Sequence, residues 1–428
     1  MSAFDAGRAV ADAVLYEGYL LYPYKASALK NQMRWQFGVV VPQASRERGS
    51  TENAHQQTEI LIDPEGDAGT TLDVLVRFLH VQRRSVEARE SDGFVPVGKL
   101  TVAGRPYVSF DETVEREIAC SIELGRQDAV AVPIVEEASQ ETTLLRDGDV
   151  TAGRIVRQRW PLHGSVTVTA ERVERLFKVR VRIENASDVV EAPERAALLR
   201  TAFVSAHTLL AVRGGRIVSL LEPPDDAAPA ANTCHNEHTW PVLTGDERID
   251  RTTSPTALSS PIILYDFPKI AESSPGQTYD ATEVDELLNL TVLTMSDDEK
   301  AEARATDERA RAIVDRAEAI SPERMSALHG TMQALASQDE EPGSGHVVVA
   351  GVRIARGSAV RLHPKGRADV WDMFLEDKLA TVAGVHTDFD ERTYVAVTVD
   401  DDPATEYHQW YGRSLFFSPD EVEPVSAP

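Results

Sequence analysis

The sequence predicts an α+β, β-rich protein with an antiparallel β-sandwich-like N-terminal domain, a helical segment and a C-terminal SH3-like small β-barrel. Two observations favour this class. Apolar and polar residues alternate with a period of two over most of residues 58–221 and again after residue 346, as in strands with one buried and one solvated face. Between these regions the pattern becomes that of short capped helices. The expected parts are a β-rich domain with a short N-terminal helix (1–260), an extended crossing and helical segment (261–337), a linker (338–346) and the barrel (347–428).

The N-terminal domain is expected to begin with a helix and to continue with strands. The spacing of Ala, Val and Leu predicts a helix over residues 6–21, which Pro23 stops. The polar residues 43–57 predict a loop. Residues 72–79 then alternate in the manner of a strand with one clearly apolar face.

Two antiparallel hairpins are expected in the same domain. Residues 166–170 and 179–183 place valines, Ala170 and Ile183 on one face and polar or basic residues on the other, which indicates a hairpin with one solvated side. Residues 203–212 and 216–221, joined by a Gly-Gly pair, predict a further hairpin.

The helical segment carries three start signals. Ser296 and Glu299 fit a capping box, Thr306 can cap a second helix, and Ser321-Pro322 opens a third. After the linker, five short strands in about 80 residues suggest the SH3-like barrel. These strands are expected at residues 347–354, 359–362, 378–386, 393–399 and 415–417.

The chain is strongly acidic. Its 428 residues include 44 Lys and Arg against 69 Asp and Glu, so its formal net charge is −25. Phosphate backbones and anionic lipids repel such a chain, which argues against nucleic-acid and membrane partners. The sequence begins without a signal peptide, has no stretch near the ~18 apolar residues of a membrane span, and has too few cysteines for a disulfide framework. We expect a cytoplasmic protein.

Aromatic residues are concentrated between Tyr16 and Phe37, beside basic and amide side chains. Tyr, Trp and Arg are enriched at the centres of protein interfaces, so this segment is a candidate contact surface. The alternative is a helix-to-strand corner whose rings fill a core. The candidate partner-binding residues are Tyr19, Tyr22, Tyr24, Arg34 and Trp35.

One short stretch concentrates possible metal ligands. Cys234, His235 and His238 offer a thiolate and two imidazoles, which suit Zn²⁺ or Ni²⁺, and His207 could complete the set. The alternative is a loop with solvated histidines and one buried thiol. The carboxylates of residues 400–402 could bind a divalent cation or simply form a solvated hairpin end.

No assembled catalytic motif is visible in the sequence. It lacks a nucleophile elbow, a zinc-protease His-Glu pair and a dinucleotide fingerprint. An enzyme that uses Cys120 or the carboxylates of residues 400–402 is the least favoured alternative. We therefore expect no enzyme activity and no cofactor.

Six long motifs are distributed over nearly the whole chain. They are ADAVLYEGYLLYPY (residues 11–24), KNQMRWQFG (30–38), SPIILYDFPKIA (260–271), DATEVDEL (280–287), TVDDDP (398–403) and FFSPDEVEP (416–424). Together they resemble an uncharacterised family encoded in bacterial gene clusters for uptake nickel–iron hydrogenases. The last two motifs resemble the barrel that those proteins carry.

The resemblance implies a non-enzymatic accessory or assembly protein, acting as a scaffold or in a chaperone-like way. Its implied partner is a hydrogenase structural subunit or precursor. This implication comes from the neighbouring genes of the family rather than from a binding or catalytic site, and it supplies no catalytic residues. The alternative function is delivery or sensing of Zn or Ni through the Cys/His stretch.

Overall fold

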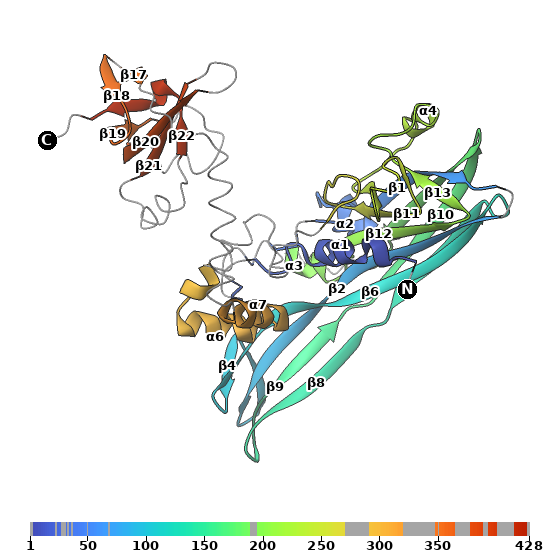
Figure 1. Ribbon diagram of the computed structural model, residues 1–428. Coiled ribbons are helices and arrows are strands. Elements are labelled where there is room, and N and C mark those ends of the chain that lie inside the picture. The colour runs from blue at the N-terminus through green and yellow to red at the C-terminus, as the bar shows by residue number, and fades with distance from the viewer. Residues whose placement is uncertain are drawn as a thin grey trace. The chain divides into compact units, whose positions relative to one another are not determined.

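The computed structural model describes most of the chain (Figure 1). Contacts within the chain divide it into two compact units, Met1–Ile320 and Ser321–Pro428. The named strands pair antiparallel, and strands make up more of the chain than helices do, which confirms the β-rich α+β class. The described residues are 3–21, 24–26, 31, 34–35, 37–48, 50–66, 69–188, 195–269, 291–319, 347–349, 351–363, 377–387, 393–399 and 415–425.

Two large sheets build the first unit. In spatial order, one contains β15 (Thr253–Ser254), β13 (Gly215–Val218), β1 (His55–Pro64), β11 (Leu176–Asn185), β10 (Leu162–Val173) and β7 (Ala129–Glu136). The other contains β14 (Trp240–Thr244), β16 (Thr256–Ser260), β12 (Val204–Arg213), β2 (Thr70–Glu90), β9 (Val150–Arg159) and β8 (Ser139–Asp147), with β3 (Gly93–Val97) and β6 (Phe110–Leu124) also paired to β2. A separate hairpin joins β4 (Lys99–Val102) to β5 (Arg105–Val108).

The longest strand, β2, belongs to both a sandwich and a projecting arm. Its residues 71–79 pair with β12 along one edge, and residues 82–88 pair with β9 farther along. Strand β6 pairs with residues 70–84 on the other edge. Figure 1 shows β2, β9 and β8 running out beyond the first sheet. We call β3, β8, β9 and the distal half of β2 the arm; it has its own small apolar core around Val86 and Ile155.

The space between the two sheets is filled by the apolar faces of their strands. Val74, Val76 and Phe78 of β2 are at most 1% exposed and share one core with Val166 of β10. The ring centroids of Phe78 and Phe203 lie 4.7 Å apart. Since burying one such side chain contributes about 1.5–3 kcal/mol, this core is a main source of the unit's stability.

One predicted hairpin is confirmed and the other is wrong. In β10 and β11, Val166 lies opposite Ile183 and Val168 opposite Val181, as the alternation predicts. In contrast, β12 pairs with β2 and β16, whereas β13 pairs with β1 and β15 in the other sheet. The chain crosses between the sheets at Gly214, whose φ is +72°. The glycine pair therefore serves a crossing rather than a tight two-residue turn.

The N-terminal elements differ from the expected boundaries. Helix α1 (Asp5–Tyr16) ends before the expected residue 21. The segment 43–57 is more than a loop, because it contains α2 (Gln43–Glu47) and the start of β1. Short helices α3 (Arg195–Leu199) and α4 (Ala228–Ala231) complete this part.

Helices α6 (Asp297–Thr306) and α7 (Glu308–Glu318) also belong to the first unit. The capping box of Ser296 and Glu299 is present as predicted. The second helix is capped by Asp307 rather than Thr306. Ala310, Ile313 and other residues of this pair share an apolar core with the segment that follows α1. None of the helices that the structure describes is long and apolar enough to span a membrane.

The second unit contains a five-stranded antiparallel sheet, in the order β22-β21-β20-β19-β23, and a separate β17–β18 hairpin. Val360, Val382 and Val395 lie in its buried core. Strands lie in all five expected regions, but residues 347–354 form two paired strands instead of one, and a further strand lies at the end. The bounds are β17 (Val347–Val349), β18 (Val352–Ile354), β19 (Ala359–Leu362), β20 (Leu379–Thr387), β21 (Thr393–Val399), β22 (Leu415–Phe417), the 3₁₀ turn η2 (Pro419–Glu421) and β23 (Val422–Pro424).

Three expected features lie outside the described residues. They are the helix start at Ser321-Pro322, the linker 338–346 and the carboxylates of residues 400–402.

Candidate functional site

Three side chains of metal-ligand type meet at the start of β1. His55 is the first residue of that strand, and Glu237 and His238 lie in the loop before β14. An isolated bridge holds the loop against the strand, with Gln57 N donating to Glu237 O at 3.1 Å and Glu237 N donating to Gln57 O at 2.8 Å. Backbone pairing therefore sets these side chains beside one another.

A buried carboxylate anchors the same loop a few residues earlier. Glu59 has a fully buried side chain that pairs with Lys178 at 2.9 Å and Arg180 at 2.6 Å. It also accepts the backbone N–H of His235 at 2.8 Å. Burial alone would raise the pKa of Glu59, but these three donors together hold it below its ordinary value. The loop is thus tied to the sheet by charge-assisted hydrogen bonds.

The cluster of His55, Glu237 and His238 is compact. His55 Nε2 lies 2.6 Å from Glu237 Oε2, and the ring centroids of the two histidines are 5.8 Å apart. One ligand atom from each residue lies within 4.8 Å of the others. Two imidazoles and one carboxylate form a known type of zinc ligand set, which leaves a coordination position open. We refer to these three residues as the His₂Glu cluster.

The pKa values of Glu237 and His238 are shifted towards the forms that bind a metal. The hydrogen bond from His55 holds the pKa of Glu237 below its ordinary value. Burial, together with the neighbouring His55, lowers the pKa of His238. Both shifts favour the ligand forms, a carboxylate and a neutral imidazole. The backbone of His238 has a φ of +62°, a strained conformation of the kind often found at functional sites.

The structure does not bring the predicted set of Cys234, His235 and His238 together. The Cys234 thiol lies against the apolar cluster of Leu61 and α4, and burial raises its pKa to about 11, so it stays protonated. His235 is anchored through its backbone N–H. His207 is fully buried, with Nδ1 2.9 Å from Ser205 O. Within the described residues only His238 of the predicted set joins a ligand cluster, and its partners are His55 and Glu237.

Sequence patterns could not have identified this combination. His55 lies 182 positions before Glu237, and the two meet only because the loop pairs with β1. A pattern of residues reports which face a side chain occupies, but it does not report which distant strand lies beside it.

The predicted partner-binding residues lie inside the first unit. Tyr19, Tyr24, Arg34 and Trp35 are 1%, 0%, 5% and 2% exposed, while Tyr22 lies outside the described residues. The half-exposed surface expected at these positions is therefore not found, and the alternative of a packed corner describes the four side chains. A partner could reach them only if this segment opened, so their role in binding stays a prediction.

Arg34 is the centre of this packed corner. Its guanidinium carbon lies 3.9 Å from the ring centroid of Trp35 and 3.7 Å from that of Phe110. It donates to the backbone oxygens of Asp111 and Tyr19. Burial lowers the pKa of Arg34 to about 10, yet the group stays charged at neutral pH. The rings and carbonyls thus replace the water that an exposed arginine would keep.

Tyr19 joins the corner to helix α7. Its hydroxyl donates to Asp307 Oδ2 at 2.9 Å, and Asp307 Oδ1 accepts the N–H of Arg309 at the start of α7. Burial raises the pKa of Tyr19, and the charge of Asp307 raises it further, so the tyrosine remains a donor. Tyr19 and Asp307 are therefore paired, whereas the buried indole N–H of Trp35 has no hydrogen-bond partner within the described residues.

No protein-family model matches the chain, and no curated protein sequence matches it. The resemblance to the hydrogenase-linked family consequently depends on the six sequence motifs alone.

Proposed function

We propose that this chain is a cytoplasmic, non-enzymatic accessory protein that binds a structural subunit of a nickel–iron hydrogenase, or its precursor, during assembly. The six motifs of the resemblance carry this proposal. A scaffold of this kind needs folded units and accessible surface rather than a reaction centre. In this proposal the sheet of residues 347–428 belongs to an SH3-like barrel.

The arm is the contact surface that best fits such a role. β8 is an edge strand of its sheet, and most of its residues are exposed. An edge strand presents unpaired N–H and C=O groups, to which an extended partner segment can add. Leu144 on this strand is 47% exposed and offers an apolar side chain beside that edge.

Affinity purification tests the proposal. The tagged full-length chain, expressed in cells that make the hydrogenase, should recover a hydrogenase structural subunit or its precursor by mass spectrometry. Leu144→Glu should reduce this recovery without changing the melting temperature, because the residue is on the surface. Ile249→Glu is the matched control, since Ile249 is 76% exposed and lies outside the arm.

Two results would separate the parts of the proposal. Recovery of hydrogenase polypeptides that is equal for both variants would reject the arm as the contact surface. Absence of hydrogenase polypeptides from every wild-type purification would reject the assembly role itself.

A second candidate function is metal binding at the His₂Glu cluster, with Zn²⁺ or Ni²⁺ as the cargo. The observation that favours it is the convergence of His55, Glu237 and His238. Three protein ligands with an open position suit a site that gives its metal away better than a closed structural site would.

Metal analysis of the purified full-length chain tests this second function. About one equivalent of Zn²⁺ or Ni²⁺ should bind to the wild type, and His238→Ala should lower the affinity by at least tenfold. His235→Ala should leave the affinity unchanged, because His235 lies in the same loop but outside the cluster. Substoichiometric metal in the wild type, or equal binding by both variants, would reject the metal function.

A further inference from the structure

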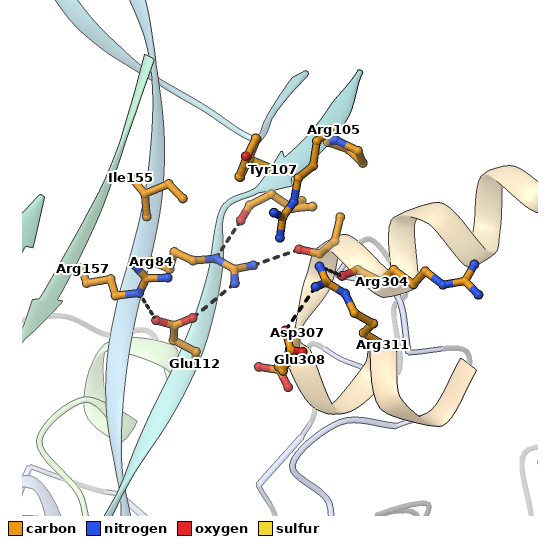
Figure 2. Close-up of a pocket in the computed structure, with 13 residues that line it drawn as sticks. Arg84, Arg105, Tyr107, Glu112, Ile155, Arg157, Arg304, Asp307, Glu308 and Arg311 are labelled. Carbon is orange, nitrogen blue, oxygen red and sulfur yellow. Dashed lines mark hydrogen bonds and ion pairs between the residues drawn. The ribbon is translucent and has the colours of Figure 1, made fainter. Parts of the chain in front are cut away.

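A cavity of about 210 Å³ lies in the first unit, between the β4–β5 hairpin, the root of the arm and the corner between α6 and α7. Its walls include five arginines, although the chain as a whole carries a net charge of −25. This space is large enough for several water molecules or one small molecule. We refer to it as the arginine pocket (Figure 2).

One side of the pocket is a rigid, fully paired framework. Arg84 donates to the backbone oxygens of Val108 at 3.1 Å and Thr306 at 2.5 Å, and it pairs with Glu112 at 3.2 Å. Glu112 also accepts from Arg157 Nε at 2.6 Å. Arg84 therefore ties the corner of α6 and α7 to the strands that line the pocket.

Other arginines keep donors available. Arg105, at the start of β5, is exposed and has a ring contact with Tyr107 but no ion pair within the described residues. Arg311 donates to Arg304 O at 3.2 Å and lies 3.4 Å from the carboxylate of Glu308, whose side chain is 80% exposed. Such an exposed pair contributes little. Figure 2 shows Arg105 and Arg311 reaching into the space from the hairpin and the helix.

Among the residues that line the pocket, the positive charge of the arginines is not fully balanced by carboxylates. Figure 2 shows the side chain of Arg304 running away from the space, where it pairs with Asp315 at 2.8 Å and with Glu318. The remaining four arginines face three carboxylates, those of Glu112, Asp307 and Glu308. Asp307 is committed to Tyr19 and to the cap of α7. A negatively charged guest would restore the balance.

We propose that the arginine pocket binds the phosphate or carboxylate group of a small molecule. The planar donors of Arg105 and Arg311 suit an oxyanion because guanidinium groups bind phosphate and carboxylate with two parallel hydrogen bonds. The ring of Tyr107 and the side chain of Ile155 line the same cavity and offer an apolar wall for the rest of the molecule. This site is distinct from the His₂Glu cluster; Ile155 and Arg157 belong to the arm, but they lie on β9 and not on the edge strand β8 proposed as the hydrogenase contact.

Isothermal titration calorimetry of the full-length chain tests the proposal with three probes: inorganic phosphate, succinate and adenosine monophosphate. Sodium chloride at matched ionic strength is the reference. At least one probe should bind with a stoichiometry near one. Arg105→Ala should weaken that binding roughly tenfold or more, as the loss of a charged hydrogen bond implies. Arg311→Gln should weaken it too, and Arg146→Ala, an exposed arginine on β8, should not.

The three probes identify the ligand chemistry. Tighter binding of adenosine monophosphate than of phosphate supports a phosphate ester whose ring lies on the apolar wall, and a preference for succinate supports a carboxylate. Failure of all three probes to bind would overturn the proposal. Binding that Arg105→Ala and Arg311→Gln leave unchanged would overturn it as well, provided that both variants keep the wild-type circular dichroism spectrum.

Discussion

The aromatic corner around Arg34 and the loop around Glu237 differ in how well their sequence patterns indicate an accessible site. The corner is the most conspicuous stretch of the sequence, yet Tyr19, Tyr24 and Trp35 are buried, and the guanidinium of Arg34 packs against the rings of Trp35 and Phe110. The loop is inconspicuous, yet it meets His55 across the sheet and forms the His₂Glu cluster. In this protein the dense aromatic pattern corresponds to a packed core. The candidate metal site, in contrast, forms where two segments far apart in the sequence pair.

Replacement of Trp35 should give the largest change in stability, and it tests whether the aromatic corner is a packed core. Trp35→Ala removes a buried ring that contacts Tyr19 and Arg34, so we expect a loss of about 3–5 kcal/mol in the free energy of unfolding. Urea unfolding followed by tryptophan fluorescence measures it. Trp240→Ala is the control, because Trp240 is 41% exposed.

A small change in stability for Trp35→Ala, together with lost hydrogenase recovery, would contradict this view of the corner. It would show that the corner opens and serves as the partner surface.

Acid should destabilise the first unit through histidines that are buried as neutral groups. Burial lowers the pKa of His207 to about 3 and that of His80 to about 4. The unfolded chain takes up these protons near pH 6.5 and the folded chain does not, so stability is lost as the pH falls from about 6.5 towards these values. The loss is up to about 1.4 kcal/mol per pH unit for each histidine.

The pH dependence of urea unfolding checks this expectation. His207→Asn should make the profile between pH 6.5 and pH 4 flatter, whereas His163→Asn should not, because His163 is exposed. A His207→Asn profile as steep as that of the wild type would show that the buried histidines do not control acid stability.

Loss of the Tyr19 hydroxyl should have a moderate effect. Tyr19→Phe leaves Asp307 Oδ2 without its buried donor, so we expect a loss of about 1–3 kcal/mol in the free energy of unfolding. Tyr265→Phe, at a position that is 88% exposed, should leave stability unchanged. Equal stability of the two variants would indicate that water replaces the hydroxyl and therefore that water reaches the interior of the corner.

Replacement of Cys234 should have the smallest effect, and it tests whether the thiol takes part in metal binding. The thiol lies outside the His₂Glu cluster and stays protonated. Cys234→Ser should therefore keep the metal affinity within about twofold and change stability by about 1 kcal/mol or less. A tenfold drop in Zn²⁺ affinity for Cys234→Ser would instead support the Cys/His set that the sequence offered as a candidate.

The sequence predicted those features that depend on short-range patterns. The alternation in residues 166–170 and 179–183 predicted the hairpin of β10 and β11, and the Ser296–Glu299 pair predicted the start of α6. Both features are set by neighbours a few positions away, which is why a local pattern suffices.

The features that it missed depend on long-range pairing. The Gly-Gly pair before Arg216 looks the same in a tight turn as in a crossing between sheets, and only the partners of β12 and β13 distinguish the two. The arginine pocket likewise combines Arg105 with Arg311, which lie on separate elements. No local pattern connects them.

Above all, we propose that this chain works by binding a hydrogenase polypeptide. Sedimentation velocity on a mixture of the purified full-length chain and the purified hydrogenase subunit precursor tests it most directly. We expect a discrete complex that sediments faster than either component. Two independent boundaries, unchanged at tens of micromolar of both proteins, would contradict it.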